Sequence, residues 1–205
     1  MNGRRFFFLF CLVVLATGCA RGGTYALYLR YDPVKELSSL QQKLGPTMGL
    51  TPFKDNRPEK SLIGVYRPLG GKPYYFTSQP FPLEKAMWEA ISQTLSQKGI
   101  KVVPRPEWGG DPDSLGNVET DSIMNLEIKQ FWSEANASLF TPRILTRVSF
   151  VIHLGVKKEG RVFTRKVDLE KEMSFPIWEW DREQMARTVN QVLATVFDEF
   201  FSNPY

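Results

Sequence analysis

Three long stretches in the second half of the chain alternate apolar and polar residues, and this alternation constrains the fold more than any other feature. They cover residues 122–133, 144–157 and 161–173. A period of two residues places the apolar side chains on one face of a strand and the polar ones on the other. Residues 157–160, Lys-Lys-Glu-Gly, form a tight hairpin between the last two stretches. The pattern predicts an antiparallel sheet with one covered face and one solvent-exposed face.

Two segments carry apolar residues at helical spacing and are expected to cover that face. The first is residues 83–98, which Pro82 can begin and Gly99 can end. The second follows Asp181, which can cap the helix, and Gln184 can complete a capping box. The apolar stripe of the second helix consists of Met185, Val189, Val192, Leu193, Val196, Phe197 and Phe200.

Shorter strands are predicted at residues 24–31, 47–53 and 100–103. Pro52 within the second of these indicates an edge strand or a bulge. We expect no regular structure at residues 34–46, and a long connection with at most short strands at 54–82. The chain shows no internal repeat. These elements predict an α+β fold, a two-layer sandwich in which a mostly antiparallel sheet carries both amphipathic helices on one face.

The N-terminal residues have the organisation of an export signal. Arg4 and Arg5 supply positive charge, and residues 6–15 are apolar. At about 1.5 Å per residue, such a helix would reach about 15 Å, half of a hydrocarbon core of about 30 Å. The segment therefore exports the protein and does not span the membrane. The two arginines also fit a twin-arginine signal, although the short n-region favours an ordinary one.

Two interpretations of the cleavage site remain. Residues 16–18, Ala-Thr-Gly, loosely fit an ordinary peptidase site, which would leave a free N-terminal cysteine. Residues 15–19, Leu-Ala-Thr-Gly-Cys, resemble the lipobox of bacterial lipoproteins, and no polar segment separates Cys19 from the apolar region. The lipobox resemblance implies cleavage between Gly18 and Cys19, a diacylglyceryl group on the Cys19 sulfur and an acylated amine. Two or three acyl chains hold a protein durably on a membrane.

This assignment divides the chain into a removed signal peptide (1–18), a lipidated tether (19–23) and a single periplasmic domain (24–205). Retention at the inner membrane of enteric bacteria uses an Asp after the lipidated cysteine, whereas this chain has Ala20. By that resemblance the protein is expected on the outer membrane, facing the periplasm. Cys11 leaves with the signal peptide, so no intramolecular disulfide can form.

Charge and residue types exclude several classes of function. The formal net charge of +4 falls to +2 when Arg4 and Arg5 are removed, and the remaining basic residues alternate with acidic ones. Nucleic-acid binding needs basic residues gathered on one face, so none is predicted. His153 is the single histidine, which excludes a metal site of several imidazoles. No metal ion and no cofactor other than the covalent lipid on Cys19 is expected.

No catalytic residues are predicted, and the protein is expected not to be an enzyme. His153 lies on the polar parity of its strand and is interpreted as solvent-facing, and no G-x-S-x-G motif is present. The carboxylate pair of Asp111 and Asp113 fits turn chemistry, and that of Glu170 and Glu172 fits an exposed strand face.

Aromatic residues in predicted loops are the candidates for a partner surface, because such residues dominate binding hot spots. They are Tyr74, Tyr75, Phe76, Trp108, Trp178 and Trp180. The alternative is that these rings fold back over the sheet or against the helices as part of the core.

The order of elements behind the lipobox resembles the YajG-like family of outer-membrane lipoproteins and, more widely, envelope domains of the TolB N-terminal type, which include auxiliary lipoproteins of ABC transporters. The resemblance is carried by residues 53–58 (Phe-Lys-Asp-Asn-Arg-Pro), 83–103 and 126–132. It implies a non-enzymatic protein that binds an envelope partner in outer-membrane assembly or envelope transport. The alternative is a periplasmic hydrolase or ligand-binding lipoprotein acting on glycans or lipids.

Overall fold

The computed structural model describes residues 22–138, 141–176 and 181–203, except for the side chain of residue 182. The first half of the chain forms short elements, which are β1 (Gly23–Tyr28), α2 (Leu40–Leu44), β2 (Thr47–Leu50), β3 (Lys54–Asp55), β4 (Gly64–Arg67), β5 (Tyr74–Gln79), α3 (Leu83–Gln97) and β6 (Lys101–Pro104). The second half forms η1 (Pro112–Asn117), β7 (Ser122–Asn136), β8 (Arg143–Val156), η2 (Lys157–Glu159), β9 (Arg161–Ser174) and α4 (Arg182–Ser202).

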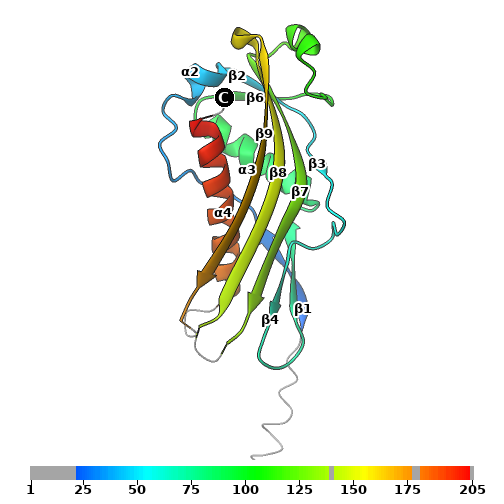
Figure 1. The fold of residues 1–205 in the computed structure, drawn as a ribbon, viewed down its shortest axis with the longest axis vertical. Coiled ribbons are helices and arrows are strands. Elements are labelled where there is room, and N and C mark those ends of the chain that lie inside the picture. The colour runs from blue at the N-terminus through cyan, green and yellow to red at the C-terminus, as the bar shows by residue number, and fades with distance from the viewer. Residues whose placement is uncertain (1–21, 139–140, 177–180, 204–205) are drawn as a thin grey trace, which may run out of the picture.

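A spine of three long antiparallel strands, β7, β8 and β9, runs the length of the molecule (Figure 1). The outer edge of β7 pairs in turn with β2, β3 and β4, all of them parallel to β7. The sheet therefore has two arms, an upper one that ends in β6 and a lower one that continues from β4 through β5 to β1. The pairings between the long strands make the sheet mostly antiparallel, although most pairings of the short strands are parallel. The fold is α+β, as predicted.

The alternation of the three long stretches is confirmed, since β8 buries Val148, Phe150, Ile152 and Leu154 on one face. The predicted hairpin between β8 and β9 contains one turn of 3₁₀ helix, η2. Gly160 closes it with φ +60°, a left-handed backbone conformation that favours glycine.

Both predicted helices are present and contribute to one apolar core with the inner sheet face. Pro82 lies at the start of α3, and Gly99 follows its end with φ +81°. Asp181 caps α4 by accepting from the Gln184 backbone N–H at 2.6 Å. The Gln184 side chain instead accepts a hydrogen bond from Arg187 at 2.9 Å. The predicted cap by Asp181 is confirmed. The described hydrogen bond of the Gln184 side chain is to Arg187 and does not complete the predicted capping box.

The opposite face of β7 is not fully exposed to solvent. The segment between β6 and β7 folds over its upper part, where Trp108, Leu115 and Val118 pack on Ile123. The sheet is therefore covered on both faces at this end, which differs from the single covered face that the alternation predicts. The sequence period reports which residues share a face but not which loop returns to cover it.

Three further expectations about elements were wrong. Residues 40–44 form the short helix α2 where no regular structure was expected, because Leu40 and Leu44 are both buried in the core. β2 lies between β6 and β7, so it is no edge strand, and Pro52 follows the strand without interrupting it. Residues 74–76 belong to β5 and not to a loop.

Candidate functional site

A groove of about 800 Å³ lies between β1 and the first half of α4. The β1 side presents the last four residues of the strand and the segment after it, and the α4 side presents one helix face. The lining includes Tyr25, Ala26, Tyr28, Val34, Ala186 and Asn190, together with the charged residues Arg30, Asp32, Glu183 and Arg187. Apolar side chains with a few polar groups are typical of a binding groove.

One wall of the groove is the outer edge of β1, which pairs with β5 on its other side and with no second strand among the described residues. Asn190 of α4 reaches this edge and takes the place of a neighbouring strand. Its Oδ1 accepts from the Arg30 backbone N–H at 3.0 Å, and its Nδ2 donates to the Tyr28 carbonyl at 3.1 Å. By the two-residue period of a strand, the N–H and C=O of Ala26 point the same way. None of the described residues is seen to bond to them on that side.

The segment that follows β1 is fixed to α4 by a buried carboxylate. Asp198 accepts from the Tyr31 hydroxyl at 3.0 Å and from the backbone N–H groups of Val34 and Lys35, both at 2.8 Å. Burial, and then the charge of Asp198, raises the pKa of Tyr31 well above its ordinary value. This carboxylate keeps β1 and α4 at a fixed separation, so the groove is preformed.

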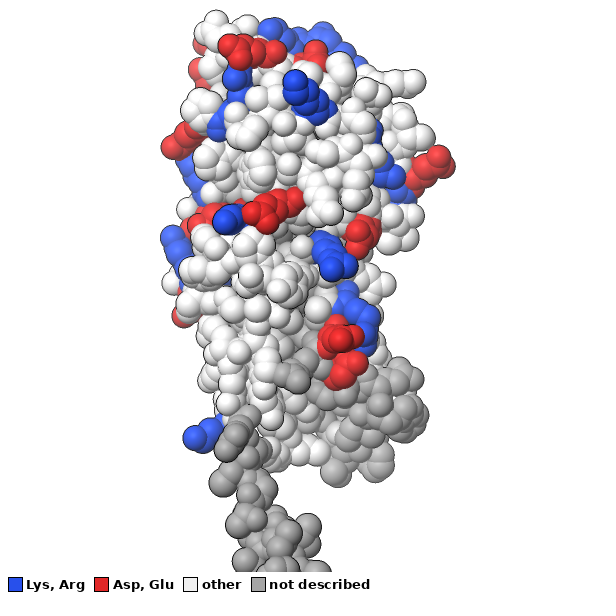
Figure 2. All heavy atoms as spheres, turned by 180° about the vertical axis from the view of Figure 1, so that it is seen from behind, with Lys and Arg blue, Asp and Glu red and all other residues white. Residues whose placement is uncertain are grey.

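Charged residues lie on both walls of the groove, Arg30 and Asp32 on the β1 side and Glu183 and Arg187 on the α4 side. In the view from behind, much of the lower half of the molecule is without Lys, Arg, Asp or Glu, apart from a charged cluster at its right-hand edge (Figure 2). The charges on the α4 side are partly satisfied, because Arg187 pairs with Asp181 at 3.1 Å and with Glu183 at 3.4 Å. Tyr28 is exposed beside this groove.

The predicted aromatic surface is only partly supported. Tyr75 is 39% exposed and Tyr74 is half-buried, but Phe76 is completely buried in the core. Trp108 is only 6% exposed, and its Nε1 donates to Ser114 at 2.8 Å. The prediction that Phe76 and Trp108 are surface residues was therefore wrong. The Phe76 ring lies in the main core, and the Trp108 ring lies in the smaller cluster over β7.

Trp178 and Trp180, the other two members of the predicted surface, lie outside the described residues, as do Gly18 and Cys19 of the predicted cleavage and lipidation site. Those assignments stay predictions. Among the described residues, no helix is both long and apolar enough to cross a membrane. No group of three or more potential ligands is found among them that could hold a metal ion.

His153 is less exposed than its strand parity predicts. Its Nδ1 lies 2.9 Å from the Thr164 hydroxyl, and its Nε2 lies 3.9 Å from Glu127. Gly110 packs directly over the ring, which explains the partial burial. A hydrogen bond from Lys129 lowers the pKa of Glu127. This is the opposite direction from the raised pKa that favours a general acid.

The other carboxylates singled out in the sequence have structural partners. Asp111 caps η1 by accepting from the Asp113 backbone N–H, which confirms the expected turn chemistry. Glu170 accepts from Arg147 at 2.8 Å, and Glu172 pairs with Arg143 at 3.3 Å. These are cross-strand ion pairs on the exposed face of β8 and β9.

The Asp-Asn-Arg-Pro segment that carries the family resemblance is a structural element. Arg57 and Asp55 form a buried ion pair. Arg57 also donates to the carbonyls of Leu62 at 2.8 Å and Phe131 at 3.1 Å. It therefore joins the connection after β3 to the middle of β7.

Sequence reasoning missed the groove itself. It lies between the first strand and the last helix, which are more than 150 residues apart in the chain. Asn190, a half-buried polar residue next to the apolar Val189 of α4, gave only a weak signal for it.

The fold has been observed before. A solved protein from Xanthomonas campestris, described as family-model DUF330, is similar with a TM-score of 0.53 and 14% identity, over 87% of this chain and 91% of that one. Lipoprotein GNA1162 from Neisseria meningitidis has a TM-score of 0.38 at 12% identity, over 74% and 98% of the two chains. A minor lipoprotein from Acinetobacter baumannii has a TM-score of 0.37 at 10% identity, over 78% and 94%.

At such low identity, the likeness to the Xanthomonas protein establishes the fold alone. No family model matches the sequence, and no curated protein matches it.

Proposed function

We propose that this protein is a lipid-anchored, non-enzymatic component of the bacterial cell envelope that binds an extended segment of a partner protein in the groove between β1 and α4. The observation that carries the binding site is the free edge of β1 beside that groove. An unpaired strand edge offers a row of backbone donors and acceptors to which an extended peptide can add as a further strand.

The arrangement around Ala26 supports this mode of binding. Asn190 already occupies the backbone groups of Tyr28 and Arg30, so an added strand would pair with the part of β1 before Tyr28. The side chains of Tyr25 and Ala186 offer apolar contacts for alternate residues of such a strand. Backbone pairing would supply affinity, and these contacts would supply specificity.

The anchor is supported by the sequence at Cys19 and by the position of the domain's first strand. β1 begins at Gly23, four residues after Cys19. With Ala20 following the cysteine, we place the protein on the outer membrane, facing the periplasm. A role in outer-membrane assembly or in transport across the envelope follows from this location and from a groove that fits peptide.

The second candidate is a ligand-binding lipoprotein. A volume of about 800 Å³ with apolar lining lies within the range of small-molecule sites, which run from roughly 300 to 1,000 Å³. A lipid or glycan in the groove would then replace the partner segment.

Photocrosslinking in intact envelopes tests the proposal. A benzoylphenylalanine at Tyr28 should capture a protein, and the crosslink should map to one segment of that protein. Ala186→Arg, which fills the groove, should abolish the capture, whereas Gln93→Arg on the exposed face of α3 should not. Capture that persists in the Ala186→Arg chain would remove the groove as the binding site. A crosslink to lipid or glycan alone would favour the second candidate.

A further inference from the structure

The loop that joins β4 to β5, residues 68–73, projects from the lower end of the molecule with an apolar and a basic side chain exposed. Leu69 is 62% exposed, and Lys72 is also exposed. A Cβ added at Gly70 would meet no atom within 4 Å, so the loop is open to its surroundings at that point. Single exposed apolar side chains are common on protein surfaces, so the position of this loop relative to the membrane anchor decides what Leu69 can contact.

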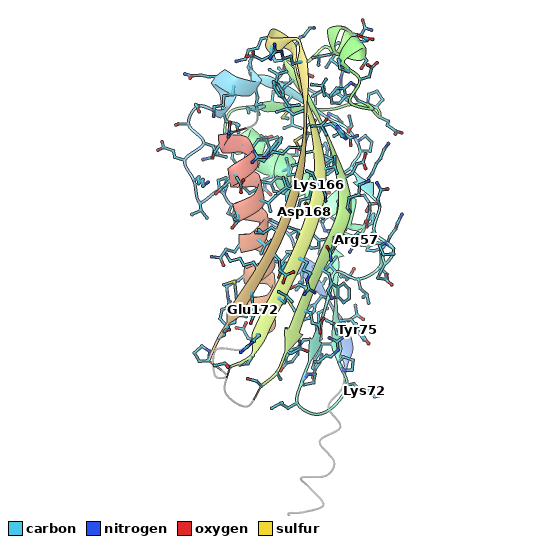
Figure 3. The ribbon with its side chains drawn as sticks, in the orientation of Figure 1. Arg57, Lys72, Tyr75, Lys166, Asp168 and Glu172 are labelled. Atoms are coloured by element: carbon cyan, nitrogen blue, oxygen red, sulfur yellow. The ribbon has the colours of Figure 1, made fainter. Side chains whose placement is uncertain are left out.

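The chain enters the domain beside this loop. A Cβ added at Gly22 would lie 2.7 Å from both the Cβ of Lys72 and the carbonyl oxygen of Pro73, so the backbone before β1 packs directly against the loop. Figure 3 shows Lys72 and Tyr75 at the end of the molecule where β1 begins. The loop and the start of the domain therefore share one end.

Chain length then limits how far the loop can lie from the anchor. Gly22 is the third residue after Cys19, and at 3.3–3.6 Å per residue the three steps between them span at most about 11 Å. If Cys19 carries the lipid, as the proposed function requires, the loop lies at the headgroup region of the same membrane. Lipid is then the nearest surface available to Leu69.

We propose that the β4–β5 loop is a second membrane contact, in which Leu69 enters the interface of the bilayer that holds the lipid on Cys19. Lys72 would lie among anionic headgroups, which attract basic residues near the surface. Tyr75, 39% exposed on the next strand, is a residue type enriched at this depth. The contact would hold the long axis of the domain upright, with the β1–α4 groove beginning near the membrane and running away from it.

The test uses the full lipidated chain in vesicles of phosphatidylethanolamine and phosphatidylglycerol. The mature chain has no free thiol once Cys19 is modified, so Leu69→Cys can carry a single environment-sensitive fluorophore. Glu159→Cys in η2, exposed at the opposite end, is the matched control. A lipid-borne quencher should reduce emission at position 69 several-fold more than at position 159, and Lys72→Glu should weaken this difference when phosphatidylglycerol is present.

Flotation of the vesicles separates the two levels of the proposal. Chains that float with the vesicles, but whose label at position 69 is no better quenched than that at 159, would overturn the membrane contact and leave the anchor intact. A label at 69 that responds to protein density and not to the quencher would identify a second copy as the occupant, which also overturns it. Chains that fail to float would contradict the anchor, and the inference would fall with it.

Discussion

Arg57 and Asp55 form a bidentate ion pair inside the protein, with Nε and Nη2 of Arg57 donating to the carboxylate at 3.0 and 2.8 Å. Their side chains are only 4% and 3% exposed. The pair closes the turn after β3, and its further bonds to carbonyl groups join that turn to β7. The short Asp-Asn-Arg-Pro segment is therefore part of the framework that sets the two arms of the sheet on the spine.

Replacing one partner of this pair should destabilise the domain strongly. Arg57→Met leaves the carboxylate of Asp55 buried without its counterion, and breaking a buried pair in this way typically costs about 3–5 kcal/mol. Urea unfolding should show this loss in the free energy of unfolding. Lys54→Met, which removes an exposed pair with Glu107, is the control and should leave it nearly unchanged. Equal stability of the two variants would contradict the buried pair.

Tyr31 makes stability depend on alkaline pH. Because burial and Asp198 raise its pKa in the folded state, the folded protein keeps the proton above pH 10, at which the unfolded chain releases it. Tyr31 therefore leaves stability unaffected below about pH 10 and reduces it above, by up to about 1.4 kcal/mol per pH unit. Urea unfolding between pH 9 and 11 should show this additional slope in the native chain and not in Tyr31→Phe. Parallel curves for the two proteins would refute it.

Much of the architecture follows from local sequence pattern. The alternation in β7 to β9 and the apolar stripes of α3 and α4 identify those elements, because the residue type at each position indicates whether that side chain is buried or exposed. The position of β1 at the far edge of the lower arm could not be obtained this way, since it depends on pairing with β5 some 50 residues later. Such pairing is fixed by tertiary packing and leaves little trace in the period of a short strand.

The candidate site was harder to predict for the same reason. Aromatic residues near Gly and Pro were interpreted as surface, but Phe76 and Trp108 are buried. Phe76 points from strand β5 into the main core, and Trp108 lies in a segment that packs on Ile123 of β7. Phe76 lies in a strand whose neighbours Tyr75 and Thr77 are more exposed, so only strand parity distinguishes the buried ring. The groove is formed by β1 and α4 together, and neither element carries a sequence motif that indicates a binding site.

The packing of α4 can be tested with a charge. Val196 is 1% exposed in the core, and Val196→Asp would bury an unpaired carboxylate, which should cost several kcal/mol of the roughly 5–15 kcal/mol that stabilise a domain. Thermal unfolding should shift strongly downward or disappear. Thr195→Asp, on the exposed side of the same turn, is the control and should leave the midpoint nearly unchanged.

The two aromatic residues that the sequence placed on one surface should behave differently. Trp108→Ala removes a buried ring and the bond from Nε1 to Ser114, and truncations of this kind cost about 3–5 kcal/mol. Tyr75→Ala should leave the free energy of unfolding within about 1 kcal/mol, because the ring is partly exposed at the end of β5. Chemical unfolding of both variants checks this, and a stable Trp108→Ala chain would show that the segment over β7 is not packed as described.

The anchor at Cys19 supports both the proposed function and the membrane contact, so the mass of the mature protein is the most direct test. Intact-mass measurement of the membrane fraction should find a chain that begins at Cys19 and carries the added mass of a diacylglyceryl group and an amide-linked acyl chain. Cys19→Ser should remove that mass and prevent processing at this position. An unmodified mature chain in the membrane fraction, or a Cys19→Ser protein with unchanged processing and membrane attachment, would contradict the account.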